Sequence, residues 1–229
     1  MALQILPHFL TRAVRKTGEQ KKSVILVATS GDTGKAAMAG FSDVPDTEVI
    51  VFYPHGGVSD AQRLQMTTQR GNNVHAVAVE GNFDDAQTGV KLLFGKAELA
   101  AELKEQGCAF SSANSINWGR LVPQIVYYFS AYADAVEKGR IQNGTEIVFS
   151  VPTGNFGDIL AGYYAKLMGL PVKKFICASN SNNVLTDFIN TGTYDRNREF
   201  HSNPFPRPWT SLFQVTWNGS FMKRPSITL

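Results

Sequence analysis

The feature that most constrains the fold is a regular alternation of short, continuously apolar runs with longer segments of helical period. The runs are bounded by Gly, Asn, Asp or Pro and lie at residues 24–29, 48–54, 74–79, 146–152 and 173–179. Strands that are apolar on both faces are typical of a parallel sheet covered by helices on both sides. The sequence therefore predicts a three-layer α/β fold with a mostly parallel sheet and right-handed crossovers.

The segments between these runs predict helices. Their expected bounds are 33–41, 59–70, 84–105, 118–138, 158–168 and 183–189. Ser59 is the first residue of one of them and Asn82 lies just before another, and both are good N-terminal caps. Asp84 and Asp85 then fit as first-turn acids that the helix dipole favours. An amphipathic pattern near the N-terminus predicts one more helix, with its apolar face at Leu3, Leu6, Phe9, Leu10 and Val14.

The composition indicates an ordinary globular protein. Of the 229 residues, 43% are hydrophobic and 18% are charged, and no apolar run approaches the length of about 18 residues that a membrane helix needs. The net charge of +3 depends on basic residues after His201, so it predicts neither a nucleic-acid nor a membrane partner. At the N-terminus the apolar stretch precedes the basic residues, the reverse of a secretory signal, and an organelle presequence is the less favoured alternative.

Cys108 and Cys177 are too few for a disulfide framework or a zinc site. Both lie among apolar or small residues, which predicts buried free thiols and a reducing, cytoplasmic setting. The four histidines show no ligand spacing, so no metal site is expected. We expect His75 to be structural, because it lies within a strand, whereas His55 in a Pro-His-Gly-Gly loop is as well explained by exposure as by function.

Three loops that precede predicted helices have the chemistry of anion receptors. In 152–158, Gly154 and Gly157 let successive backbone N–H groups approach a phosphate, although a glycine-rich connection without a ligand explains this pattern equally well. In 28–34, the hydroxyls of Thr29 and Ser30, the glycine that follows them and a helix start suit a carboxylate or a phosphate. A Walker motif is absent, since Thr29 stands where that motif needs its first glycine. A dinucleotide fingerprint is also absent, since no Gly-x-Gly-x-x-Gly follows a predicted strand.

The third loop, 114–120, opens the helix expected at 118–138. Arg120 can bind an oxyanion through two parallel hydrogen bonds, or it can be a surface arginine. Asn114, Ser115 and Asn117 can act as ligands, but they are also explained as helix caps.

Taken together, five segments in this order resemble the threonine synthases, which are fold-type II pyridoxal-phosphate enzymes related in fold to the tryptophan synthase β subunit. The segments are ATSGDTGKAA (28–37), YPHGGVSDAQRLQM (53–66), EGNFDDAQ (80–87), NSINWGR (114–120) and VPTGNFGD (151–158). The resemblance runs from Met1 to about His201, so we expect an incomplete enzyme core at 1–201. We expect residues 202–229 to be a poorly ordered tail outside the family.

The resemblance implies a function and a role for each loop. The reaction would be the conversion of O-phospho-L-homoserine and water to L-threonine and phosphate, with pyridoxal 5′-phosphate as the cofactor. The cofactor phosphate would be held by Gly154, Asn155, Phe156, Gly157 and Asp158. The substrate's carboxylate would bind Ser30, Gly31, Asp32 and Thr33, and its phosphate would bind Asn117 and Arg120.

The resemblance also predicts what the chain lacks. The family's Schiff-base lysine, which is also its usual base, lies in a Phe-Lys-Asp segment whose place falls directly before Met1. Lys35 belongs to the shared SGDTGK pattern and does not replace it. The segment after His201 is rich in Pro and aromatic residues. Back-translation of residues 206–219 with allowed codons, read in a shifted frame, can give a continuation that resembles the family. We therefore expect an internal start, a frameshifted tail and an impaired enzyme.

Two alternatives remain open. Another fold-type II enzyme, such as a cysteine synthase or a dehydratase, would tend to have Asn in place of Asp32 and to lack the 53–66 segment. The other alternative is a non-catalytic threonine-synthase-like protein with a binding or signalling role.

Overall fold

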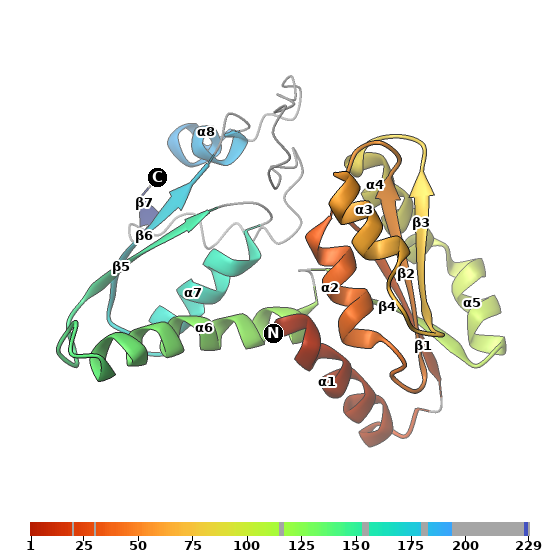
Figure 1. Cartoon of the computed structure of the whole chain (residues 1–229), viewed down its shortest axis with the longest axis horizontal. Coiled ribbons are helices and arrows are strands. Elements are labelled where there is room, and N and C mark those ends of the chain that lie inside the picture. Colours follow the sequence, from red (N-terminus) through yellow and green to blue (C-terminus); the bar gives the residue numbers. More distant parts are fainter. Residues whose placement is uncertain are drawn as a thin grey trace. The chain divides into compact units, whose positions relative to one another are not determined.

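The computed structural model describes residues 1–19, 21–29, 31–114, 117–152, 156–179, 183–193 and 227–228. These residues form two compact units that divide between Arg120 and Leu121. Each unit has its own parallel sheet (Figure 1), and each has its own hydrophobic core. The boundary expected between residues 201 and 202 lies outside the described residues.

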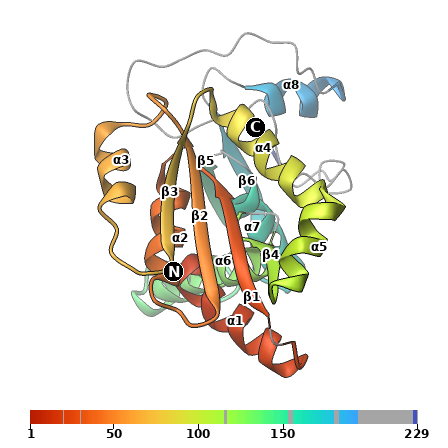
Figure 2. The same ribbon diagram turned by 90° about the vertical axis from the view of Figure 1, so that its right-hand side faces the viewer.

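The first unit is a parallel sheet with helices on both faces. In chain order it contains α1 (Ala2–Lys16), β1 (Lys22–Ala28), α2 (Asp32–Phe41), β2 (Thr47–Pro54), α3 (Asp60–Thr67), β3 (Val74–Val79), α4 (Phe83–Gly95), α5 (Ala97–Glu105) and β4 (Cys108–Ser112). The strand order is β3-β2-β1-β4, and every neighbouring pair is parallel (Figure 2).

Strand β1 shows why the runs are continuously apolar. Ile25 and Val27 pack with α1, α2 and α3, whereas Leu26 and Ala28 pack against α4 on the opposite face. All four side chains are buried. The three layers predicted from the sequence are therefore present in this unit, because each successive residue of the strand enters a different core.

The expected helices and strands are confirmed with small shifts at their ends, apart from three differences. The two-residue strand β7 (Ile227–Thr228) was not predicted, and it lies in the segment that was expected to be poorly ordered. Strand β4 was not predicted, since its Cys-Ala-Phe-Ser-Ser sequence is short and only half-buried at the edge of the sheet. The helix expected at 84–105 is two helices, because Lys96 after Gly95 takes an extended conformation with ψ of 100°. Cys177 is buried as predicted, but the expectation for Cys108 was wrong, because its edge strand leaves it half-buried.

Both predicted caps are confirmed. The Ser59 hydroxyl accepts a hydrogen bond from the Gln62 backbone N–H, and the Gln62 side chain accepts one from the Ser59 backbone N–H. Asn82 forms the equivalent reciprocal pair with Asp85 at the start of α4. Each pair satisfies N–H groups that have no partner within the helix.

The second unit contains α6 (Trp118–Glu137), which begins in the first unit, β5 (Ile147–Pro152), α7 (Gly157–Leu167), β6 (Val172–Ala178), α8 (Val184–Thr191) and β7 (Ile227–Thr228). Its parallel sheet has the order β5-β6-β7. The core joins Tyr128 of α6, Ile159 of α7 and Phe175 of β6. A side chain at Gly162 would meet both aromatic rings, with its Cβ 2.6 Å from Tyr128 and 2.7 Å from Phe175.

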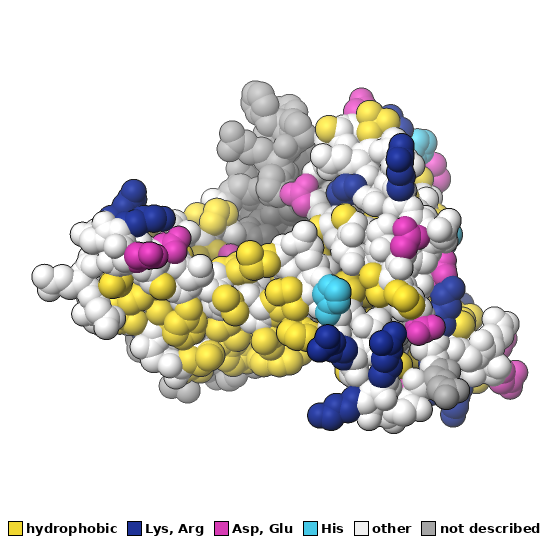
Figure 3. Space-filling model, turned by 60° about the horizontal axis from the view of Figure 1, so that its bottom comes forward, with side chains coloured by type: hydrophobic (Ala, Val, Ile, Leu, Met, Phe, Trp, Pro, Cys, Tyr) yellow, Lys and Arg dark blue, Asp and Glu magenta, His cyan; other side chains and the backbone are white. Residues whose placement is uncertain are grey.

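Part of the second unit's surface is apolar. Hydrophobic side chains gather over the body that contains α6, on the left of Figure 3. Its exposed large hydrophobic residues are Val126, Val148, Leu167, Met168 and Ile176. Within the described residues, no helix combines the length and apolarity needed to cross a membrane.

Candidate functional site

The loop between β1 and α2 is organised around the hydroxyl of Thr29. Its buried Oγ1 accepts hydrogen bonds from the backbone N–H groups of Gly31 and Gly34, at 3.0 Å and 2.9 Å. Gly31 has φ of +150°, a conformation that residues with a side chain rarely adopt. The loop thus leads tightly into the first turn of α2, which contains Asp32 and Thr33. Ser30, the remaining predicted residue of this loop, lies outside the described residues.

Helix α3 packs directly over this loop. Gln62 Nε2 donates a hydrogen bond to Asp32 Oδ1 at 3.1 Å, and a Cβ on Gly31 would lie only 2.3 Å from the same nitrogen. A Cβ on Gly34 would lie 2.8 Å from Met66 Sδ. Sequence reasoning assigned no role to Gln62. The signal was its place in the 53–66 motif, although spacing alone does not reveal that this motif folds onto residues 31–34.

The segment before α6 reaches the same loop. Arg120 Nη2 donates to Thr33 Oγ1 at 3.3 Å, and Nη1 donates to the Ala113 carbonyl at 3.1 Å. Asn114 Nδ2 donates to the carbonyl of Ala28, at the end of β1, at 3.1 Å. The structure therefore brings together Arg120 and Thr33, which were predicted as parts of two separate anion receptors.

Asn117 has protein partners at both polar atoms of its side chain. Oδ1 accepts from the Gly119 N–H at 2.9 Å, and Nδ2 donates to the Ser112 carbonyl at 2.6 Å. These contacts are what the capping alternative requires, and they hold the start of α6 against the end of β4. A role of Asn117 as a substrate ligand stays a prediction.

The predicted cofactor loop belongs to the second unit, and only its last part is described. Gly154 and Asn155 lie outside the described residues. Phe156 is buried in a left-handed conformation, φ +67°, and α7 begins directly after it at Gly157. The helix dipole gives this end of α7 a partial positive charge, which favours an anion beside it.

Asp158 lies in the first turn of α7 beside Tyr128. Burial raises the pKa of the Asp158 carboxyl above its ordinary value, and the Tyr128 hydroxyl partly opposes that rise. Burial and the neighbouring Asp158 also raise the pKa of Tyr128, which keeps its hydroxyl protonated. Asp158 Oδ1 is buried and has no hydrogen-bond partner among the described residues.

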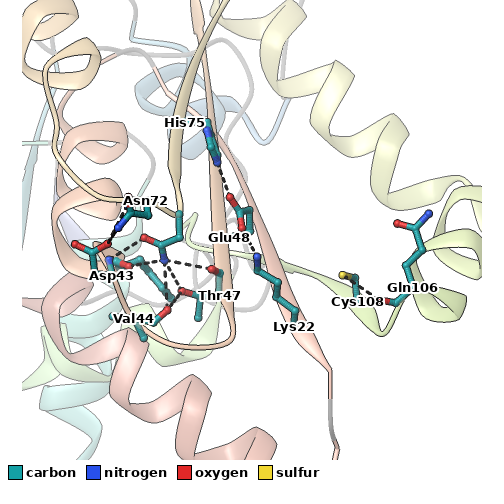
Figure 4. A network of polar contacts seen from close by, with 11 residues as sticks. Lys22, Asp43, Val44, Thr47, Glu48, Asn72, His75, Gln106 and Cys108 are labelled. Carbon is teal, nitrogen blue, oxygen red and sulfur yellow. Dashed lines mark hydrogen bonds and ion pairs between the residues drawn. The ribbon is translucent and has the colours of Figure 1, made fainter.

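Two of the histidines, His55 and His75, contact glutamate side chains away from these loops. His55 Nδ1 lies 2.7 Å from Glu80 Oε1. His75 contacts Glu48, which also pairs with Lys22, in a row across three neighbouring strands (Figure 4). The Lys35 ammonium donates to Gln69 Oε1. Across the part of the chain that the structure describes, no group of three or more His, Cys, Asp or Glu side chains is arranged to hold a metal ion.

Comparison with known structures defines the class of fold. The yeast threonine synthase crystal structure matches with a TM-score of 0.71 at 39% identity, over 88% of this chain and 39% of that one. A pyridoxal-phosphate-bound threonine synthase from Brucella melitensis matches with a TM-score of 0.71 at 42% identity, over 85% of this chain and 39% of that one. The fold is thus that of the fold-type II pyridoxal-phosphate enzymes, as the sequence predicted.

Sequence comparison narrows this class. Human threonine synthase-like 1 is 49% identical over 201 residues, covering 85% of this chain and 27% of that protein. Threonine synthase of Pseudomonas aeruginosa is 45% identical over 195 residues, covering 85% of this chain and 39% of that enzyme. The chain belongs to the threonine synthase family. It spans between 27% and 39% of the length of these relatives. No family model matches it.

Proposed function

We propose that this chain carries the cofactor and substrate receptors of a threonine synthase in the cytoplasm. The reaction is the conversion of O-phospho-L-homoserine and water to L-threonine and phosphate. The observation that carries the proposal is the 3.3 Å contact between Arg120 Nη2 and Thr33 Oγ1. It joins two anion receptors of different sequence motifs, and a substrate with a carboxylate at one end and a phosphate at the other needs two receptors close together.

The residues at the start of α7 fit the phosphate of pyridoxal 5′-phosphate. The N-terminal end of α7 carries the positive end of the helix dipole, and the left-handed Phe156 turns the chain into this helix. The buried Oδ1 of Asp158, which has no partner among the described residues, can accept a hydrogen bond from a water that also donates to the phosphate. In this proposal the cofactor phosphate is held by Gly154, Asn155, Phe156, Gly157 and Asp158.

The chain's own residues bind and orient the substrate. Ser30, Gly31, Asp32 and Thr33 receive its carboxylate, and Asn117 and Arg120 receive its phosphate. Arg120 is anchored to the Ala113 carbonyl through Nη1, which limits the motion of its guanidinium. When bound, pyridoxal phosphate supplies an electron sink for carbanionic chemistry at the substrate.

The test is binding followed by turnover, with the full 229-residue chain. Pyridoxal phosphate is titrated by absorbance, and O-phospho-L-homoserine is titrated into the loaded protein by calorimetry. We expect Arg120→Met to weaken O-phospho-L-homoserine binding about tenfold or more, because a charge-assisted pair is lost. The exposed Arg140 supplies a matched control, Arg140→Met, which should leave the affinity unchanged. Wild-type protein that binds neither compound would contradict the proposal.

A second candidate is a non-catalytic threonine-synthase-like binding protein. The observation in its favour is the 49% identity to human threonine synthase-like 1, a relative that differs in name from the threonine synthases. Covalent attachment of the cofactor to a lysine, fixed by borohydride, together with threonine formation favours the enzyme. Binding of both compounds without attachment or threonine formation favours the binding protein.

A further inference from the structure

Two sequence motifs of the first unit interlock at the candidate carboxylate receptor. Residues 31–35 contact α3 and the turn after it. Gly31 lies under the Gln62 side-chain amide, and the Asp32 carboxylate accepts a hydrogen bond from that amide. Lys35 then donates to Gln69 Oε1. The 53–66 motif, which has no role in the proposed chemistry, therefore forms one wall of the loop.

The two ends of the Gln62 amide have different tasks. Oε1 accepts from the backbone N–H and the hydroxyl of Ser59, both at 3.1 Å, and so completes the cap of α3. Nε2 donates to Asp32 Oδ1 at 3.1 Å. Because the cap occupies Oε1, the donor end of the amide is the end that faces α2.

The Asp32 carboxylate poses a problem for an anion receptor. It lies in the first turn of α2, where a carboxylate is attracted by the same N–H groups and helix dipole that attract a bound anion. Thr29 Oγ1 already engages the N–H groups of Gly31 and Gly34. The backbone N–H groups of Asp32 and Thr33 are the other donors of this turn. If the Asp32 carboxylate folded back onto these two N–H groups, it would compete with the bound ligand.

We propose that Gln62 is a positioning residue for this receptor, an inference that rests on the proposed function. By donating to Asp32, it holds the carboxylate on the α3 side and keeps it off the N–H groups of the first turn of α2. Its amide also fills the space over Gly31 and so fixes the approach to that turn. The ligand class is the carboxylate of an amino-acid substrate, and Gln62 does not touch it.

The two tasks of Gln62 can be separated by isosteric changes. Gln62→Glu keeps the oxygen that completes the cap but replaces the donor with a charge that repels Asp32. Adding Asp32→Asn to Gln62→Glu restores a hydrogen bond between positions 62 and 32. The donor is then the asparagine amide at position 32, and the acceptor is the introduced carboxylate at position 62. Ser59→Ala serves as the matched control, because it weakens the cap and leaves the Nε2 contact in place.

The first experiment measures the affinity of the pyridoxal-phosphate-loaded full chain for O-phospho-L-homoserine. We expect Gln62→Glu to weaken it about threefold to tenfold. The Asp32→Asn/Gln62→Glu double variant should recover most of the lost affinity, because the receptor uses the backbone N–H at position 32, which asparagine keeps. Ser59→Ala should lower the melting temperature without changing affinity. Equal losses in Gln62→Glu and in the double variant would overturn the proposal.

The second experiment needs no ligand. Amide hydrogen exchange at residues 32 and 33 should change in Gln62→Glu and return toward wild type in the double variant. If exchange there is the same in all three proteins, the positioning role is refuted even where the substrate binds. If the exchange pattern holds and wild type fails to bind O-phospho-L-homoserine, the proposed function fails and the positioning of Asp32 stands.

Discussion

The Tyr128 hydroxyl donates a 2.9 Å hydrogen bond to the backbone carbonyl of Asp158, and so joins the middle of α6 to the first turn of α7. The ring of Tyr128 packs edge-on against Phe149 and Phe175, with centroids 4.8 Å and 6.1 Å apart. Gly162 makes room for it, since a Cβ there would overlap the ring. One side chain thus fills the core of the second unit and fixes the turn that follows the predicted cofactor loop.

Asp158→Asn should change how stability depends on pH. The folded-state pKa of Asp158 is raised from 3.8, so folding favours its protonated form. Its stabilising contribution is therefore complete below pH 3.8 and is lost as the pH rises through the higher folded value. Relative to wild type, Asp158→Asn should gain stability between acid and neutral pH, as measured by urea unfolding at several pH values. A difference between the two proteins that does not vary with pH would contradict this.

Tyr128→Phe tests the effect of the Tyr128 hydroxyl on the pKa of Asp158. The Tyr128 hydroxyl lowers the pKa of Asp158, so its removal should raise that pKa further and extend the pH-dependent loss of stability to higher pH. The lost hydrogen bond to the Asp158 carbonyl should in addition cost about 1 kcal/mol of unfolding free energy at all pH values. Urea unfolding of the variant over the same pH series separates the two effects.

Much of this arrangement was predictable from the sequence, and the rest was not for identifiable reasons. Strand β1 was predictable because Ile25 and Leu26 enter different cores, which leaves a continuous apolar run. Strand β4 lacks that signal, because it lies at the edge of the sheet that the described residues form and its side chains are only half-buried. Among the site residues, the types and order indicated anion-binding loops, but the contact of Gln62 with Asp32 spans 30 positions. No local period reports a pairing over that distance.

Asn73→Ala should be among the most destabilising polar substitutions in the first unit. The buried Asn73 side chain donates to the carbonyls of Phe41 and Thr47 and accepts from the Asp43 N–H. Its removal deprives the Asp43 N–H of this acceptor and the Phe41 and Thr47 carbonyls of this donor, so we expect a loss of about 2–3 kcal/mol in chemical denaturation. The neighbouring Asn72, which is exposed, is the control, and its change to Ala should cost less than about 1 kcal/mol.

The row of Lys22, Glu48 and His75 in Figure 4 predicts a pH-dependent contribution of opposite sign to that of Asp158. The Lys22 ammonium lowers the pKa of Glu48 below 4.5, so its contribution is present above pH 4.5 and is lost as the pH falls through the lower folded value. Glu48→Gln should cost about 0.5–1 kcal/mol near neutral pH and nothing in strong acid. Glu80→Gln, at a more exposed pair with His55, should cost less at neutral pH in the same unfolding assay.

Two helical glycines should respond in opposite directions to the same substitution. A Cβ on Gly40 of α2 would lie 2.0 Å from the Leu3 carbonyl oxygen of α1, a backbone atom that cannot move without shifting the helix. Gly40→Ala should therefore cost about 1–3 kcal/mol or more, because α1 is forced away from α2.

Gly89 of α4 is the contrasting case, because a Cβ added there would meet no atom within 4 Å beyond its chain neighbours and its own helix backbone. Gly89→Ala should stabilise the chain by up to about 1 kcal/mol, because alanine has the higher helix propensity. Thermal unfolding followed by circular dichroism compares them, and equal shifts in melting temperature would show that α1 does not pack on α2 through Gly40.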